Sequence, residues 1–120
     1  MKILIADDSR VMRQIVIRTL RQAGVGDHDL IEAADGRQAL DMTKAESPDL
    51  VLSDWNMPEL TGIEVLRNLR AAGNDVKFGF VTSESTPEMK EQADSAGALF
   101  FIVKPFSADR FDEVFAPILG

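Results

Sequence analysis

The chain has 120 residues, 45% of them hydrophobic, so it can bury one core without disulfides. It lacks the run of roughly 18 apolar residues that a membrane-spanning helix needs. It has no cysteine, which excludes a disulfide framework, a thiolate metal site and a cysteine nucleophile, and its early acidic residues do not suit a signal peptide. The formal net charge of −7 argues against nucleic acid as a partner, and we expect a single cytoplasmic domain over residues 1–120.

Short apolar segments alternate with amphipathic segments along the chain. The pattern predicts strands over residues 2–6, 30–34, 50–53, 76–82 and 98–103. It predicts a first helix that Ser9 caps and that Gly24 and Gly26 end, and a last helix that Ser107 caps. Between them it predicts helices over 37–46, 59–72 and 88–96. Such alternation is typical of βαβ units with right-handed crossovers. The predicted fold class is therefore α/β, a doubly wound parallel sheet, although alternation alone does not reveal the strand order.

Several residues refine these elements. Either Ser85 or Thr86 caps the helix over 88–96, and Pro87 suits its first turn. Gly79 lies inside a predicted strand, where it allows a close approach of packing neighbours. The residues at helical spacing that we expect to face the core are Met12, Val16, Leu20, Ala39, Leu40, Thr43, Ile63, Leu66, Leu69, Ala72, Phe111, Val114, Phe115 and Ile118.

Polar residues that suit chemistry follow four of the predicted strands. Asp7 and Asp8 follow the first strand, and Asp54 follows the third. Thr82 ends the fourth strand, and Lys104 follows the fifth. The carboxyl ends of parallel strands meet at one edge of the sheet, where ligands bind in open α/β folds. Each residue alone suits a helix cap, a turn or a solvated loop, but their joint occurrence at one edge indicates a functional site.

The residue types at this edge point to a metal and a phosphoryl group. Three neighbouring carboxylates repel one another unless a cation lies between them, and oxygen ligands with room for water favour Mg²⁺. A zinc site is not expected, because the only histidine, His28, precedes the second strand and suits a solvated loop. Lys104 and a metal can neutralise a phosphoryl group to which Thr82 donates a hydrogen bond. Since a carboxylate is a known phosphoryl acceptor, the pattern predicts an acyl-phosphate site at Asp54.

The motifs at the ends of the strands match those of a known family over the whole chain. They are Asp7-Asp8-Ser9, Asp54-Trp55-Asn56-Met57-Pro58 followed by Gly62, Thr82, and Lys104-Pro105-Phe106. On these residues the chain resembles a response-regulator receiver domain, of the stand-alone CheY-like type. The resemblance implies a flavodoxin-like sheet with strand order 2-1-3-4-5.

The resemblance also implies roles for individual residues. Asp54 is expected to be the phosphoacceptor, with Thr82 and Lys104 in contact with the phosphoryl group. Asp8 and Asp54 are expected to bind Mg²⁺ through their side chains. Asp7 is expected to assist, often through water, and the Asn56 backbone carbonyl to complete the protein's share of the ligands. The resemblance further implies a cis peptide bond between Lys104 and Pro105.

Other positions concern the lifetime of the phosphoryl group and the switch. Asn56 and Glu84 match side chains that tune dephosphorylation in CheY-like members, and Thr82 and Phe101 match the pair that moves on activation. Two positions depart from the common pattern. Ser83 stands where the family usually has alanine or glycine, and we expect it to narrow access to Asp54 or to add a hydrogen bond. Phe101 stands where many members have tyrosine, so the switch aromatic has no hydroxyl to bond.

The expected function is that of a two-component signalling switch rather than an enzyme. A histidine kinase would phosphorylate Asp54, and the face formed by 88–96, 98–103 and the last helix would change its affinity for a protein target. The expected target is a flagellar-motor switch protein, with a phosphorelay protein, another kinase or another regulator as the alternative, and a phosphatase as an optional further partner. Asp109, Asp112 and Glu113 make the last helix of this face acidic rather than basic. We expect a monomer that contacts neither nucleic acid nor membrane.

Three other functions compete with this interpretation. A flavodoxin-type electron carrier shares the sheet, but Asp7 and Asp8 would repel the flavin phosphate. A metal-dependent phosphatase with an aspartyl nucleophile usually carries that residue after its first strand and has a lid domain, for which the chain has no room. A receiver that has lost phosphorylation would act as a constitutive binding module. The chain keeps the complete set of acids, threonine and lysine, which argues against this function.

Overall fold

The computed structural model describes residues 1–24, 29–104 and 106–119, in which five parallel strands form one sheet in the order β2-β1-β3-β4-β5. For residues 118 and 119 the description covers the backbone alone. The strands are β1 (Lys2–Ala6), β2 (Asp29–Ala33), β3 (Leu50–Ser53), β4 (Lys77–Thr82) and β5 (Phe101–Val103). The α/β fold class and the strand order implied by the resemblance are both confirmed.

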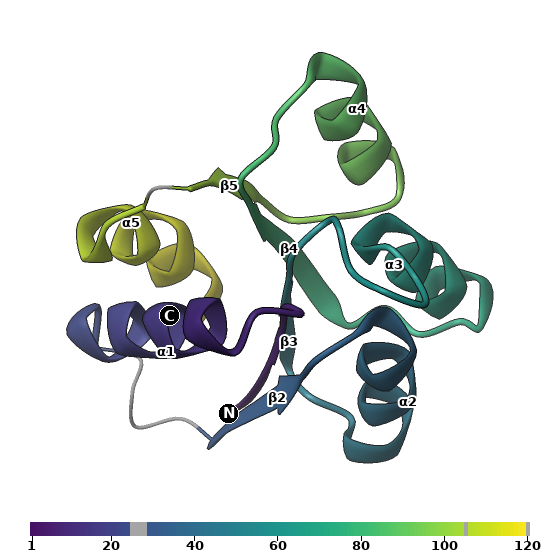
Figure 1. Ribbon diagram of the computed structural model, residues 1–120, viewed down its shortest axis with the longest axis horizontal. Helices are drawn as coiled ribbons and strands as arrows, with labels where there is room; N and C mark the ends of the chain where they lie inside the picture. The colour runs from purple at the N-terminus through teal and green to yellow at the C-terminus, as the bar shows by residue number, and fades with distance from the viewer. Residues whose placement is uncertain (25–28, 105, 120) are drawn as a thin grey trace.

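Five helices in the same residues cover the two faces of the sheet. They are α1 (Arg10–Gln22), α2 (Gly36–Glu46), α3 (Gly62–Ala71), α4 (Pro87–Ser95) and α5 (Ala108–Leu119). Helices α1 and α5 lie on one face, and α2, α3 and α4 lie on the other (Figure 1). Within the described ranges, no helix is both long and apolar enough to cross a membrane.

Alternation along the strands divides the core into two parts. Ile3 and Ile5 of β1 pack with α1 and α5, whereas Leu4 and Ala6 pack with α2, α3 and α4. Successive side chains of a strand point to opposite faces, so a strand covered on both sides is apolar throughout. The part under α1 and α5 also holds the predicted core residues Phe111 and Phe115, both buried.

The close approach predicted at Gly79 is present. A side chain at this position would overlap the ring of Phe100, which packs on the same face of the sheet. The Phe100 ring in turn lies 5.3 Å from the ring of Phe115 on α5. Glycine at position 79 therefore leaves room beside β4 for the Phe100 ring, which packs on Phe115 of α5.

Several predicted boundaries are wrong. Helix α3 begins at Gly62 rather than at residue 59, because Glu59 has a positive φ of 70° and Thr61 caps the helix. The Thr61 and Glu64 side chains bond each other's backbone N–H groups, a capping box that fixes this start. Ala72 is exposed as the C-cap of α3, not part of the core.

Strand β5 is shorter than predicted, because the Ala98 N–H donates to the Ala93 carbonyl at the end of α4, 2.9 Å away. Strand β2 lies one residue earlier than predicted. Four predictions lie outside the described residues: the role of Gly26, the loop at His28, the Lys104–Pro105 bond and the Ile118 side chain.

The N-cap of α4 can be tested, because the sequence offered two candidates and the structure selects Thr86, whose hydroxyl accepts from the Met89 N–H at 3.1 Å. We expect Thr86→Ala to lower the free energy of unfolding by about 0.5–2 kcal/mol. Ser85→Ala is the control, since Ser85 is exposed and caps no helix of the described chain. Urea denaturation checks both variants. Equal losses in the two, or a larger loss for Ser85→Ala, would show that the cap is misassigned.

Candidate functional site

Asp7 lies where β1 ends, and each of its polar groups has a partner. Its N–H continues the β1–β2 ladder by donating to the Ala33 carbonyl at 3.1 Å. Its Oδ1 accepts from the Ser9 N–H at 2.9 Å, which closes a tight loop before α1. Ser9 then caps α1 by accepting from the Met12 N–H at 3.2 Å, as predicted. The Asp7 side chain is therefore buried in a fixed orientation.

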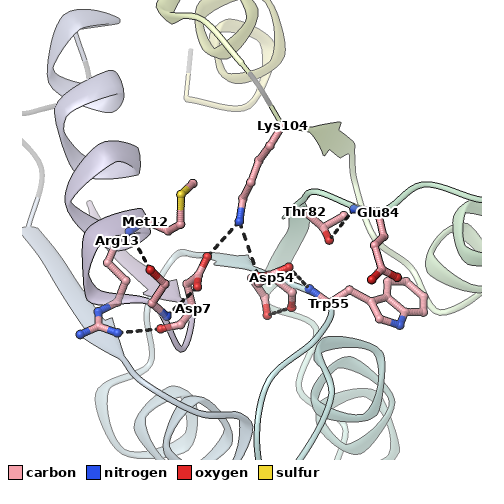
Figure 2. Close-up of polar contacts among 10 residues, drawn as sticks. Asp7, Met12, Arg13, Asp54, Trp55, Thr82, Glu84 and Lys104 are labelled. Atoms are coloured by element: carbon pink, nitrogen blue, oxygen red, sulfur yellow. Dashed lines mark hydrogen bonds and ion pairs between the residues drawn. The ribbon is translucent and has the colours of Figure 1, made fainter.

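Asp54 follows β3 and lies beside Asp7, because β1 and β3 are neighbours in the sheet. Its N–H donates to the Ala6 carbonyl at 2.9 Å, and its Oδ1 accepts from the Trp55 N–H at 2.7 Å. The side chain is 13% exposed, and one carboxylate oxygen is held by the backbone while the group keeps a small opening to a ligand. Figure 2 shows Asp54 between Asp7 on one side and Thr82 on the other.

Lys104 extends from the end of β5 across the edge of the sheet to both carboxylates (Figure 2). Its Nζ lies 3.1 Å from Asp7 Oδ2 and 3.5 Å from Asp54 Oδ2. The Lys104 N–H donates to the Thr82 carbonyl at 2.8 Å, which anchors the backbone from which the side chain extends. The predicted meeting of residues from strands one, three and five is thus observed.

Asp8 completes an acidic cluster with Asp7 and Asp54, in which one carboxylate oxygen from each residue lies within 4.8 Å of the others. Asp8 is exposed, and together with Asn56 it lines a shallow hollow beside the cluster. All the donors are oxygens, and the open side leaves room for water. This donor set fits a hard divalent cation such as Mg²⁺.

The pKa of Asp54 is raised above its ordinary value, chiefly because burial disfavours the charged carboxylate. The nearby Lys104 ammonium lowers this pKa, the Asp7 carboxylate raises it, and the Thr82 hydroxyl and Trp55 N–H lower it. The net direction upward shows that one lysine does not fully offset desolvation and a second acid. A carboxylate in such surroundings gains from an additional cation.

Thr82 is fully buried at the end of β4, where its hydroxyl accepts from the Glu84 N–H at 3.3 Å. Ser83 and the Glu84 side chain are both exposed on the loop that follows. Phe101 is half-buried, and its ring centroid lies 6.2 Å from that of Trp55 and 5.9 Å from that of Phe80. The predicted switch residue therefore packs on the neighbour of Asp54 rather than standing apart from the site.

Two residues of the site were not predicted from the sequence. Arg13 Nη1 donates to the Asp7 carbonyl at 2.7 Å, and the Ser53 hydroxyl donates to the Asp54 carbonyl at 2.8 Å. A signal for Arg13 existed, since it shares the inward face of α1 with Ile17 and Leu20, at i, i+4 and i+7. A charged residue in an otherwise apolar stripe requires a polar partner.

Comparison with known proteins identifies the family. Residues 3–116 match the family described as the response regulator receiver domain. The chain is 40% identical to the chemotaxis protein CheY-3 of Vibrio cholerae in an alignment of 121 positions that covers 96% of this chain and 92% of that protein. It is 36% identical to the chemotaxis protein CheY of Pseudomonas aeruginosa in an alignment of 126 positions that covers both chains completely.

Solved structures agree with this result. The chemotaxis protein CheY4 of Vibrio cholerae superimposes with a TM-score of 0.84 at 34% identity, covering 98% of this chain and 97% of that chain. A LuxR-family response regulator of Staphylococcus aureus, at 24% identity and a TM-score of 0.88, shows the same fold. The flavin-carrier and phosphatase alternatives are therefore set aside. The chain belongs to the response-regulator receiver family, the signalling switches of two-component systems, and is a CheY-like member of it.

Proposed function

We propose that Asp54 accepts a phosphoryl group from a histidine kinase in a Mg²⁺-dependent reaction, and that this modification changes the affinity of the chain for a protein target. The observation that carries the proposal is the largely buried Asp54 carboxylate, which has the Lys104 ammonium at 3.5 Å and two further acids within 4.8 Å. The expected receiver domain over residues 1–120 and its expected location in the cytoplasm form part of the same proposal.

In the proposed reaction, a carboxylate oxygen of Asp54 bonds to phosphorus as the bond between phosphorus and the donor's imidazole nitrogen breaks. The bonding electrons leave with that nitrogen. The Trp55 N–H holds Asp54 Oδ1, so the carboxylate is oriented before the donor arrives. Lys104 and the Thr82 hydroxyl are assigned to the phosphoryl oxygens, where positive charge and a hydrogen-bond donor lower the barrier.

Asp7, Asp8, Asp54 and the Asn56 backbone carbonyl are the residues that would hold Mg²⁺. When bound, the metal supplies positive charge beside the phosphoryl oxygens. The exposed position of Asp8 and Asn56 at a shared hollow supports this assignment, because an ion there keeps some of its water. Glu84 and Asn56 are assigned to the rate of dephosphorylation, since both are exposed and a hydrolytic water arrives from solvent.

The proposed switch connects Asp54 to the face formed by α4, β5 and α5. Phe101 packs on Trp55 on one side and on the other lines a hollow of about 540 Å³ together with Lys90, Val103, Phe106 and Arg110. Movement of Thr82 and Phe101 on phosphorylation would therefore reshape this hollow. The matched relatives are named as chemotaxis proteins, which favours a flagellar-motor switch protein as the target.

The lining of the hollow refines the expected chemistry of the target. Asp109, Asp112 and Glu113 make α5 acidic, but Lys90 and Arg110, the latter 3.6 Å from Glu113, flank the apolar side chains of the hollow itself. A partner segment with apolar and acidic residues therefore suits this face. Another kinase, a phosphorelay protein or another regulator with such a segment is the alternative target.

The phosphoacceptor can be tested by intact mass after incubation with acetyl phosphate. The parent protein should gain one phosphoryl mass with Mg²⁺ and none with EDTA, and Asp54→Asn should gain none, because it removes the nucleophile. Asp75→Asn, on an exposed loop, is the matched control and should behave like the parent. Labelling of Asp54→Asn at the parent level would refute the assignment. Labelling of neither protein would favour a constitutive binding module.

The metal ligands can be tested by titration with Mg²⁺. Asp8→Ala removes a direct ligand and should weaken Mg²⁺ binding at least tenfold, given that loss of even an indirect partner typically costs about 10–100-fold. Trp55 is the only tryptophan and adjoins Asp54, so its fluorescence reports the titration. Asp41→Ala, exposed on α2, is the control. An unchanged midpoint for Asp8→Ala would remove Asp8 from the ligand set.

The raised pKa of Asp54 predicts a pH-dependent stability in EDTA. The folded protein keeps a proton on Asp54 at pH values where the unfolded chain, with an ordinary pKa of 3.8, has released it. Protonation of Asp54 therefore contributes to the free energy of unfolding. This contribution is fully present below pH 3.8 and is lost as the pH rises through the raised pKa. Asp54→Asn should be more stable than the parent at pH 7, and this gain should shrink as the pH falls. Urea denaturation midpoints of the parent and of Asp54→Asn, measured across pH, check this prediction. A difference between the two midpoints that stayed constant with pH would contradict the raised pKa.

A further inference from the structure

The Arg13 side chain joins three parts of the protein at the acidic site. It extends from the first turn of α1, its Nε lies 2.9 Å from Glu32 Oε1 on the edge strand β2, and its Nη1 donates to the Asp7 carbonyl at 2.7 Å. Only 13% of the Arg13 side chain is exposed, so the guanidinium is held in place rather than solvated. Figure 2 shows Arg13 directed from the helix to the loop that carries Asp7.

The carbonyl that Arg13 contacts belongs to the peptide unit between Asp7 and Asp8. A peptide unit is planar, so fixing its carbonyl oxygen also fixes the direction of the Asp8 N–H and limits the directions in which the Asp8 side chain can leave the chain. The Asp7 side chain is held separately, by Ser9 and Lys104. Asp8 is exposed, so its orientation depends on the backbone, and Arg13 is a side chain that restrains this backbone.

The charge of Arg13 alone would oppose a cation at the acidic cluster. Glu32 offsets this charge, because its carboxylate lies 2.9 Å from Arg13 Nε, although the Glu32 side chain is 37% exposed. The pair adds no net charge to the site. What remains is the short hydrogen bond to the Asp7 carbonyl, a charge-assisted contact of the stronger kind.

We propose that Arg13 is a positioning residue that orders the Asp7–Asp8 peptide, so that the Asp8 carboxylate faces Asp54 before a divalent cation binds. The inference rests on the proposed function, because it concerns the affinity of the proposed metal site. A ligand already held in its bound orientation loses less conformational freedom on binding, which raises affinity. Arg13 is assigned neither to the metal ligands nor to the phosphoryl oxygens, since its observed partners are Glu32 and the Asp7 carbonyl.

Isothermal titration calorimetry with Mg²⁺ on Arg13→Met, Arg13→Lys and Glu32→Gln tests the proposal. Arg13→Met keeps the apolar stem but loses the donor, and it should weaken Mg²⁺ binding about tenfold. Arg13→Lys keeps a charged donor group and should recover part of this loss. Glu32→Gln keeps an acceptor for Arg13 but removes the charge that offsets it, so it should weaken Mg²⁺ binding, though less than Arg13→Met does. Tighter binding by Arg13→Met would show that the charge of Arg13 matters more than its hydrogen bond, and would overturn the proposal, as would unchanged binding.

The amide of Asp8 gives a second measurement that needs no metal. In EDTA, ¹⁵N relaxation should show a lower order parameter for the Asp8 N–H in Arg13→Met, with little change at Asp35, the N-cap of another helix. An equal order parameter at Asp8 would overturn the inference even if the affinity fell. Failure of the parent to bind Mg²⁺ would instead refute the metal part of the proposed function and the affinity part of this proposal. The order parameter would still decide whether Arg13 orders the loop.

Discussion

The contact of the Lys104 ammonium with Asp7 and Asp54 is the interaction on which the site depends. Two carboxylates in one partly buried pocket repel each other and lose hydration, and burial of charge is tolerated in proteins when a partner compensates it. Lys104 provides that compensation at 3.1 and 3.5 Å, from a position 97 residues beyond Asp7 in the chain. The sheet order brings Lys104 to this distance from Asp7, because β1, β3, β4 and β5 are successive neighbours in the sheet.

The same edge of the sheet connects the site to a distant surface through aromatic packing. Trp55 follows Asp54 directly, and its ring lies 5.0 Å from that of Phe80 and 6.2 Å from that of Phe101. Close-packed rings adjust in discrete steps rather than continuously, because the interior has little free volume. A change at Asp54 that moved Trp55 would therefore alter the packing of Phe101. This packing gives the proposed switch a physical connection that needs no hydroxyl on residue 101.

Much of this arrangement follows from the sequence, for a simple reason. The carboxyl ends of parallel strands meet at one edge, so Asp7, Asp54 and Lys104 could be placed together without knowledge of any distance. Alternation does not reveal that Asp7 is buried while Asp8 is exposed, or that Arg13 bonds the carbonyl between them. Those facts depend on side-chain directions in a loop. The start of α3 was missed because Glu59 adopts a left-handed conformation that non-glycine residues rarely show.

The balance of charge in the pocket is the reason for including a divalent cation in the proposed chemistry. Three carboxylates and one ammonium give the pocket a formal charge of −2, since the Arg13–Glu32 pair adds no net charge. An incoming phosphoryl donor is itself anionic, so it would meet a pocket of its own sign. A single further lysine would leave the pocket negative, whereas an ion of charge +2 brings it to neutrality and takes the oxygen ligands that are present. The raised pKa of Asp54 has burial as its chief cause, and the neighbouring Asp7 carboxylate raises it further, because a nearby negative charge disfavours the charged form.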